Sequence, residues 1–231
     1  MGGKLTGDGG SVTPIHPGAQ GRAPALVRAY WEALRRGRLV PARAEVDPRG
    51  IEQALEYAFI AERIAPGMAR FRLAGMHLND LMGMEVRGMP LSTFAAPESR
   101  KRLSDALEAV FQGPEIAELT LLAEPGIGKP PLSAKLLILP LKSDLGDINR
   151  VMGCLVSDGQ IGRSPRRFNI SDVRMSAIVA GQPTGAESAL PLPAARHQPG
   201  FAEPAPEPLA PPQGSPEARR AMLRLVARND G

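Results

Sequence analysis

The chain has 231 residues, with 28 basic and 24 acidic side chains, a net charge of +4 and only 4% aromatic residues. No apolar run approaches the roughly 18 residues of a membrane span, and Met1 to Gly10 has no signal-peptide core, so we expect neither a span nor export. The single cysteine, Cys154, excludes a disulfide framework within one chain and favours a reducing, cytoplasmic location. Because the basic residues are spread along the chain rather than gathered in a stripe, we expect no nucleic-acid binding.

The N-terminal part of the chain is predicted to be a disordered tail followed by one helix. Residues 1–22 are rich in Gly, Pro and polar residues, which is typical of disorder. The helix has Pro24 in its first turn and ends at Gly37. Its tryptophan either anchors the helix to the domain, since an aromatic side chain buries a large area, or contacts a partner. The candidate partner-docking residues on its apolar face are Tyr30, Trp31 and Leu34.

The next segment predicts a short helix followed by two strands. Asp47 and Pro48 combine a cap with a preset first helical residue, and the inward side of this helix is predicted to carry Ile51, Ala54 and Leu55. A strand is expected from Tyr57 to Ile64. In the second strand, Ala69, Phe71 and Leu73 alternate with arginines, the pattern of a half-buried strand that Gly75 ends.

The rest of the predicted domain holds a helix from Pro97 to Gly113 and three more strands. The strands run over Ile116–Glu124, Leu132–Leu141 and Ile148–Val156, and tight turns between them require antiparallel pairing. The predicted fold class is therefore α+β, a five-stranded antiparallel sheet with the helices on one face, within a domain of residues 23–162.

Two segments are predicted beyond the domain. Residues 163–214 contain most of a proline-rich stretch that cannot bury enough apolar surface to order itself, so they are interpreted as a disordered linker. Residues 215–231 are interpreted as a short docking element, either an amphipathic helix or an added strand, with a frayed tail as the alternative. Its docking candidates are Met222, Leu225 and Val226.

The sequence offers little that suggests catalysis. It has no phosphate-binding loop and no Gly-x-Ser-x-Gly nucleophile turn. His16, His77 and His197 lie in separate segments, so no metal site is expected. His77 is the polar residue closest to the middle of the domain, and Cys154 is interpreted as a small buried hydrophobe.

Spaced motifs between Leu26 and Val156 resemble the PAS domain family, in its stand-alone bacterial branch. One motif reads Trp-x-x-Leu-Arg-x-Gly-Arg-x-x-Pro-x-Arg-x-x-x-Asp-Pro, and another combines Arg-x-x-Gly with Gly-x-x-x-x-Gly. The residues that match are Trp31, Leu34, Arg35, Gly37, Arg38, Pro41, Arg43, Asp47, Pro48, Arg72, Gly75, Gly83 and Gly88. The resemblance implies a five-stranded antiparallel sheet flanked by short helices, a small apolar cavity, and a surface that pairs with itself or a signalling partner.

The resemblance does not imply one cofactor, and we expect none. A haem-binding relative would carry its ligating His on the long helix, but Arg100 to Gln112 contains none, and Cys154 is far from the position of a flavin-reactive cysteine. The first hypothesis is a non-enzymatic sensory or regulatory module that acts on a signalling protein or as a homodimer. The alternatives are a small α+β enzyme with His77 as general base, and nucleic-acid binding. The ligand-cavity candidates are Phe71, Met76, His77, Leu81, Leu107, Phe111 and Cys154.

Overall fold

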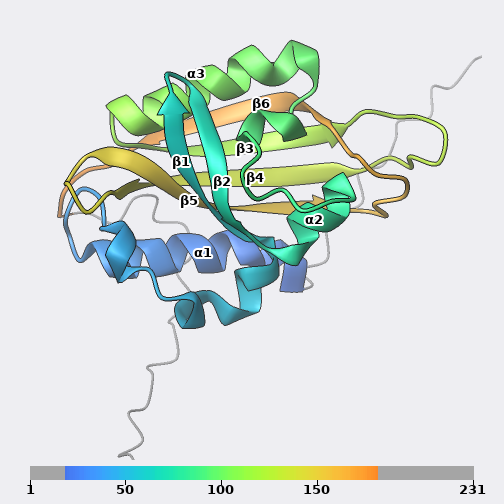
Figure 1. Cartoon of the computed structure of the whole chain (residues 1–231). Helices are drawn as coiled ribbons and strands as arrows, with labels where there is room; N and C mark the ends of the chain where they lie inside the picture. The colour runs from blue at the N-terminus through green and yellow to red at the C-terminus, as the bar shows by residue number, and fades with distance from the viewer. Residues whose placement is uncertain (1–18, 182–231) are drawn as a thin grey trace, which may run out of the picture. The chain divides into compact units, whose positions relative to one another are not determined.

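A six-stranded antiparallel sheet forms the centre of the protein, of which the computed structural model describes residues 19–181. Every neighbouring pair of strands runs antiparallel, and the first two strands lie at one edge of the sheet (Figure 1). In spatial order the strands are β2 (Met68–Ala74), β1 (Ala58–Ala65), β5 (Ile148–Asp158), β4 (Ser133–Lys142), β3 (Glu115–Ala123) and β6 (Phe168–Ala177).

Helices cover both faces of the sheet. On the face that we call the inner face lie α3 (Arg100–Gln112), which is preceded by η4 (Pro97–Ser99), and the shorter α2 (Met76–Met82) and η3 (Leu91–Phe94). On the opposite, outer face lie α1 (Ala19–Arg35) and the 3-10 segment η2 (Pro48–Tyr57), joined through η1 (Arg43–Glu45). Figure 1 shows α1 and α3 on opposite sides of the strands. The expectation that all helices lie on one face is wrong, because β4 and β5 carry buried apolar side chains on both of their faces.

Aromatic rings fill the core of the inner face. Phe71 lies between Phe59 and Phe94, and its ring centroid is 5.4 Å from that of Phe59 and 5.7 Å from that of Phe94, both in edge-on geometry. Phe59 pairs across the sheet with Gly153. A Cβ atom at Gly153 would lie 2.6 Å from Cζ of Phe59 and 2.2 Å from the carbonyl oxygen of Leu137, so only glycine fits there.

The predicted α+β class, with an antiparallel sheet, short flanking helices and an N-terminal helix, is confirmed, with one strand more than expected. That strand, β6, lies in the segment 163–214 that the sequence assigned to a linker. Its apolar residues do not alternate regularly, because Ser171 is an extra residue at a register shift opposite Thr120 and Leu121. The domain therefore extends past Gly162.

The ends of the predicted domains also differ in part. Helix α1 begins at Ala19, so the last residues of the predicted tail 1–22 are helical, and Pro24 lies inside the helix rather than in its first turn. The C-terminal part of the predicted linker and the whole docking element 215–231 lie outside the described residues. Within residues 19–181, no helix is long and apolar enough to cross a membrane.

Candidate functional site

Four of the predicted cavity residues lie together in the packed core of the inner face. Phe71, Leu81, Leu107 and Phe111 are at most 4% exposed and belong to one cluster of buried side chains. The structure thus brings these four candidates together in the core, and their role as the lining of a ligand cavity stays a prediction. They contact packed neighbours, and the rings that meet at Phe71 occupy the middle of the space between the sheet and the helices.

Two other cavity candidates lie elsewhere. Met76 is 64% exposed, because it is the first residue of α2 and its side chain faces away from the core. Cys154 is fully buried, but in the cluster of the outer face beneath α1. Its pairing partner across β1 is Ala58, one residue before Phe59, and neighbouring residues of a strand point to opposite faces. Burial raises the pKa of the Cys154 thiol to about 12, so this thiol is held in its unreactive, protonated form.

His77 lies at the start of α2 and contacts the end of β5. Its Nε2 atom accepts a hydrogen bond from the backbone N–H of Ser157 at 3.3 Å, and the Ser157 hydroxyl oxygen lies 3.1 Å from the same nitrogen. The ring packs edge-on against Tyr57 at a centroid distance of 5.0 Å. Burial lowers the pKa of His77, and the carboxylates of Asp80 and Glu56 oppose this shift only in part. The imidazole is therefore neutral near pH 7, with its proton on Nδ1.

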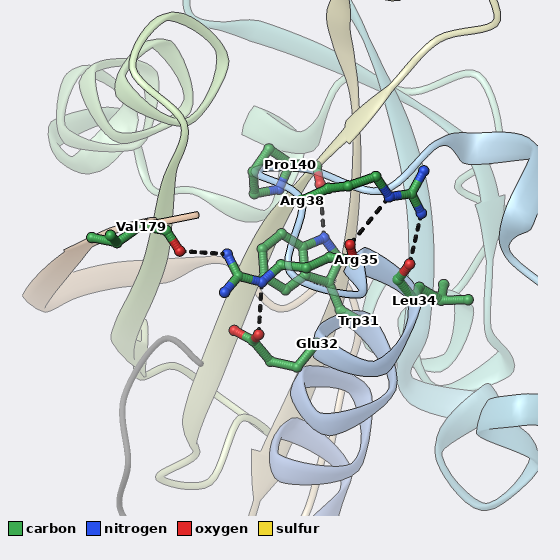
Figure 2. Close-up of polar contacts among 7 residues, drawn as sticks. All are labelled: Trp31, Glu32, Leu34, Arg35, Arg38, Pro140 and Val179. Carbon is green, nitrogen blue, oxygen red and sulfur yellow. Dashed lines mark hydrogen bonds and ion pairs between the residues drawn. The ribbon is translucent and has the colours of Figure 1, made fainter. Parts of the chain in front are cut away.

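The predicted docking residues of α1 hold the helix to its own domain. The indole of Trp31 is completely buried against the sheet, and its Nε1 atom donates to the carbonyl oxygen of Pro140 at 2.8 Å (Figure 2). Tyr30 is half-buried, and its hydroxyl exchanges hydrogen bonds of 2.9 and 2.7 Å with the backbone of Asp47. Leu34 is half-buried as well. The interpretation of Trp31 as a packing anchor is therefore correct, and a partner cannot contact its ring while α1 stays in place.

The arginines that follow Trp31 fix the end of α1. Arg35 is 1% exposed, donates to Glu32 at 2.8 Å and to the Val179 carbonyl at 3.2 Å, and lies over the Trp31 ring (Figure 2). Arg38 donates at 2.8 Å to the Leu34 carbonyl, an oxygen that the helix end would leave unpaired. The polar residues of the motif after Trp31 thus fix the turn at residues 35–38, which follows α1 and which we call the joint.

Arg38 also connects this joint to η1. Its guanidinium contacts both carboxylate oxygens of Glu45, at 2.7 and 2.8 Å. Glu45 accepts a further bond from the backbone N–H of Ala42, and the Arg38 contact lowers the pKa of the Glu45 carboxyl. Because η1 leads directly into η2, this contact ties the start of η2 to the end of α1.

An apolar groove opens where η2 passes over β1 and β2 on the outer face. Helix α1 packs on β4 and β5, so the outer face of β1 and β2 is left to η2 and solvent. The groove has a volume of about 270 Å³, and its lining is mostly apolar. Leu55 and Leu73 stand on its two sides and are 44% and 45% exposed. The lining residues are Val46, Pro48, Ile51, Leu55, Ala58, Phe59, Ile60, Leu73, Ala74, Gly75, Arg87 and Met152.

A bulge in β2 places Leu73 in this groove. Ile60 pairs with Leu73 and Ala61 pairs with Phe71, so Arg72 is an extra residue between them. The extra residue reverses the alternation, and Leu73 lies on the outer face although Phe71 lies in the inner core. The sequence pattern had predicted Leu73 on the same face as Phe71, and Leu55 on the inward side of its helix; both predictions are wrong. The bulge leaves no signal in the alternation of apolar residues and arginines.

Acidic side chains lie beside the groove. Glu52 and Glu56 are exposed on η2 on either side of Leu55, and neither forms an ion pair or side-chain hydrogen bond among residues 19–181. They line a second, shallower hollow of about 570 Å³, which shares Leu55, Ala74 and Gly75 with the apolar groove. The cation in the groove, Arg87, is paired with Glu85 at 3.2 Å.

Comparison with known proteins agrees with the fold. The sequence pattern of the PAS domain matches residues 20–156, more than half of the chain. The chain is therefore an α+β domain of the sensory type, and it belongs to the PAS domain family. None of the curated proteins matches it.

Two solved structures match part of the chain at low sequence identity and low TM-score. One is the light-state structure of the blue-light photoreceptor Aureochrome1 LOV, with 13% identity, a TM-score of 0.35, and coverage of 48% of this chain and 88% of that one. The other is an RNA-binding light-oxygen-voltage receptor, with 16% identity, a TM-score of 0.36, and coverage of 51% of this chain and 35% of that one. Membership of the PAS family gives the chain a sensory or regulatory role in signalling.

Proposed function

We propose that this PAS domain is a non-enzymatic module of cytoplasmic bacterial signal transduction, and that it acts by binding another protein through the groove between η2 and β2. The observation that carries the proposal is the pair of half-exposed leucines, Leu55 and Leu73, on the part of the outer face that α1 leaves open. Contiguous exposed apolar side chains with a polar rim are typical of protein interaction sites. The partner is a signalling protein or a second copy of this chain.

The size of the groove supports a protein partner. Sites for small molecules occupy about 300–1000 Å³ and enclose most of their ligand. The groove, at about 270 Å³, lies just below this range and is open to solvent, which suits side chains of a partner protein better than an enclosed small molecule. A small apolar ligand in the inner core stays a prediction, and the edge-on packing of Phe59, Phe71 and Phe94 argues against space for it.

The alternative with His77 as a general base has one supporting contact, the 3.1 Å approach of the Ser157 hydroxyl to Nε2. Ser157 is 3% exposed and His77 is 9% exposed, and no carboxylate hydrogen-bonds to the ring among the described residues. A base that also accepts a backbone N–H bond already has its lone pair occupied. Labelling of Ser157 in the native chain by a fluorophosphonate probe would support this alternative; we expect none.

Site-directed photo-cross-linking in the host cells tests the proposed function. Leu73 is replaced by p-benzoyl-phenylalanine, and Ile127, which is 93% exposed in the turn between β3 and β4, carries the same group as the control. We expect one partner, identified by mass spectrometry, to cross-link from position 73 and not from position 127. The cross-link should be lost when Leu55→Gln is added. Equal cross-linking from both positions, or none from position 73, would contradict the proposal.

A further inference from the structure

We infer that the partner segment in the groove is an amphipathic helix that carries basic residues beside its apolar stripe. This inference rests on the proposed function and names the chemistry of the partner. It is drawn from the two hollows that meet at Leu55, one apolar and one lined by carboxylates.

The apolar part of the surface suits a helix. Leu55 on η2 and Leu73 on β2 flank a hollow whose floor is formed by Ala58, Ile60 and Met152. An amphipathic helix presents anchors at i, i+3 or i+4, and i+7, and inserts them as a row into such a groove. An extended segment would need a free strand edge instead. At the middle of β2 that edge is occupied, since the backbone of Phe71 bonds to Gly88 and Met89 at 2.9 Å.

The polar part selects the charge of the helix. Glu52 and Glu56 are both exposed on η2, four residues apart, and neither has a cationic partner among residues 19–181. Their negative charge favours a segment with Lys or Arg beside its apolar stripe and disfavours an acidic one. The neighbouring acid Glu62 does not contribute in this way, because it is paired with Arg72 and with Arg150.

Met76 extends the apolar surface past these carboxylates. It is 64% exposed and lines the acidic hollow together with Ala74 and Gly75. A helix whose first apolar side chains fill the groove would thus contact Met76 beyond Leu55 with its next apolar side chain. Methionine adapts its shape to different partners, which suits a docking surface.

Binding of synthetic helical peptides to the full chain tests the inference. The probe is a fluorescent peptide of about 18 residues with leucines at i, i+3, i+4 and i+7 and arginines on both sides of that stripe. The comparison peptide has glutamate in place of every arginine. We expect the basic peptide to bind at least about tenfold more tightly than the acidic one at low salt, with the difference shrinking as salt screens the charges.

Variants of the full chain locate the binding. We expect Leu73→Thr to weaken the basic peptide about tenfold or more, because it removes an apolar side chain and keeps a strand-forming residue. The matched control is Leu122→Thr, which changes a 51% exposed leucine on β3. Glu52→Gln and Glu56→Gln should each weaken binding about two- to fivefold, as expected for exposed ion pairs, while Glu98→Gln should have no effect.

Three results would overturn the inference. The first is equal affinity of the chain for the two peptides, and the second is an affinity for the basic peptide that Leu73→Thr does not change. The third is a dimer in sedimentation that dissociates in Leu73→Thr, because the groove would then be covered by a second copy of the chain. A different result contradicts the proposed function, namely the absence of a specific cross-link from position 73. A specific cross-link combined with equal peptide affinities would uphold the function and refute the basic helix. Unfolding curves of each variant show that it is folded.

Discussion

Removing the indole of Trp31 tests whether α1 is part of the folded domain. Trp31 is completely buried between α1 and the sheet, and its Nε1 atom donates to the Pro140 carbonyl at 2.8 Å. Truncation of a buried Trp to Ala costs about 3–5 kcal/mol. Since a domain is stable by only about 5–15 kcal/mol, Trp31→Ala should remove about a fifth or more of the free energy of unfolding.

A second variant separates the hydrogen bond from the packing. Trp31→Phe keeps most of the apolar surface and removes the donor to Pro140, which should cost about 1–3 kcal/mol for the buried carbonyl that loses it. Ala33→Gln, on the exposed side of the same helix, is the control and should change stability by less than about 0.5 kcal/mol. Urea unfolding followed by circular dichroism measures all three variants.

The reasoning also requires one cooperative transition. If α1 is part of the domain, its helical signal and the signal of the sheet disappear at the same urea concentration. A loss below about 1 kcal/mol in Trp31→Ala, or an early transition that involves the helix alone, would refute the claim that α1 belongs to the core. The helix would then be available for docking, as the sequence had allowed.

Three further predictions concern Gly153 in the inner core, the imidazole of His77, and Cys154 in the outer core. Gly153→Ala places a Cβ against Phe59 and a backbone carbonyl, so we expect it to lower stability by about 1–3 kcal/mol or more; an unchanged melting temperature would contradict the packing. The native pKa of His77 lies below its ordinary value of about 6.5, so the unfolded chain takes up this proton first as the pH falls. The His77 contribution to stability is complete above pH 6.5 and is lost progressively below it; His77→Gln should flatten the stability profile between about pH 7 and 5, and an identical slope would refute this. Cys154, with its pKa raised to about 12, should react with a maleimide far more slowly in the native chain than in urea, and equal rates would show that it is accessible.

The sequence predicted those elements whose side chains follow a regular period. The three strands from β3 to β5 lie within two residues of their predicted bounds, because long runs of apolar residues separated by glycine turns admit few other structures. The helix predicted from Pro97 to Gly113 is present as η4 followed by α3, which begins at Arg100. The packing of α1 on the sheet could also be predicted in part, since the sequence allowed Trp31 either to pack against the domain or to contact a partner. What no pattern showed was that Arg35 and Arg38 hold the end of this helix.

Two of the failures share one physical cause, an extra residue in a strand. In β2 the extra Arg72 turns Leu73 outward, and in β6 the extra Ser171 breaks the alternation, so the strand was assigned to a linker. A bulge is fixed by pairing with the neighbouring strand, and a single strand's own sequence does not contain that information. The groove was missed for the same reason, because one of its two leucines occupies its position only through the bulge.

The bond between Arg35 and the Val179 carbonyl joins residues 144 positions apart and has a consequence for synthesis of the chain. A ribosome adds about 5–20 residues per second, so α1 is made about 7–29 s before its last acceptor exists. Because α1 packs on β4 and β5, its stripe of Ala23, Val27 and Trp31 has no sheet to cover it until those two strands are made. The Arg35 bond forms later still, because Val179 follows β6 in the chain, so the last contact of α1 is completed only after β6 has been made.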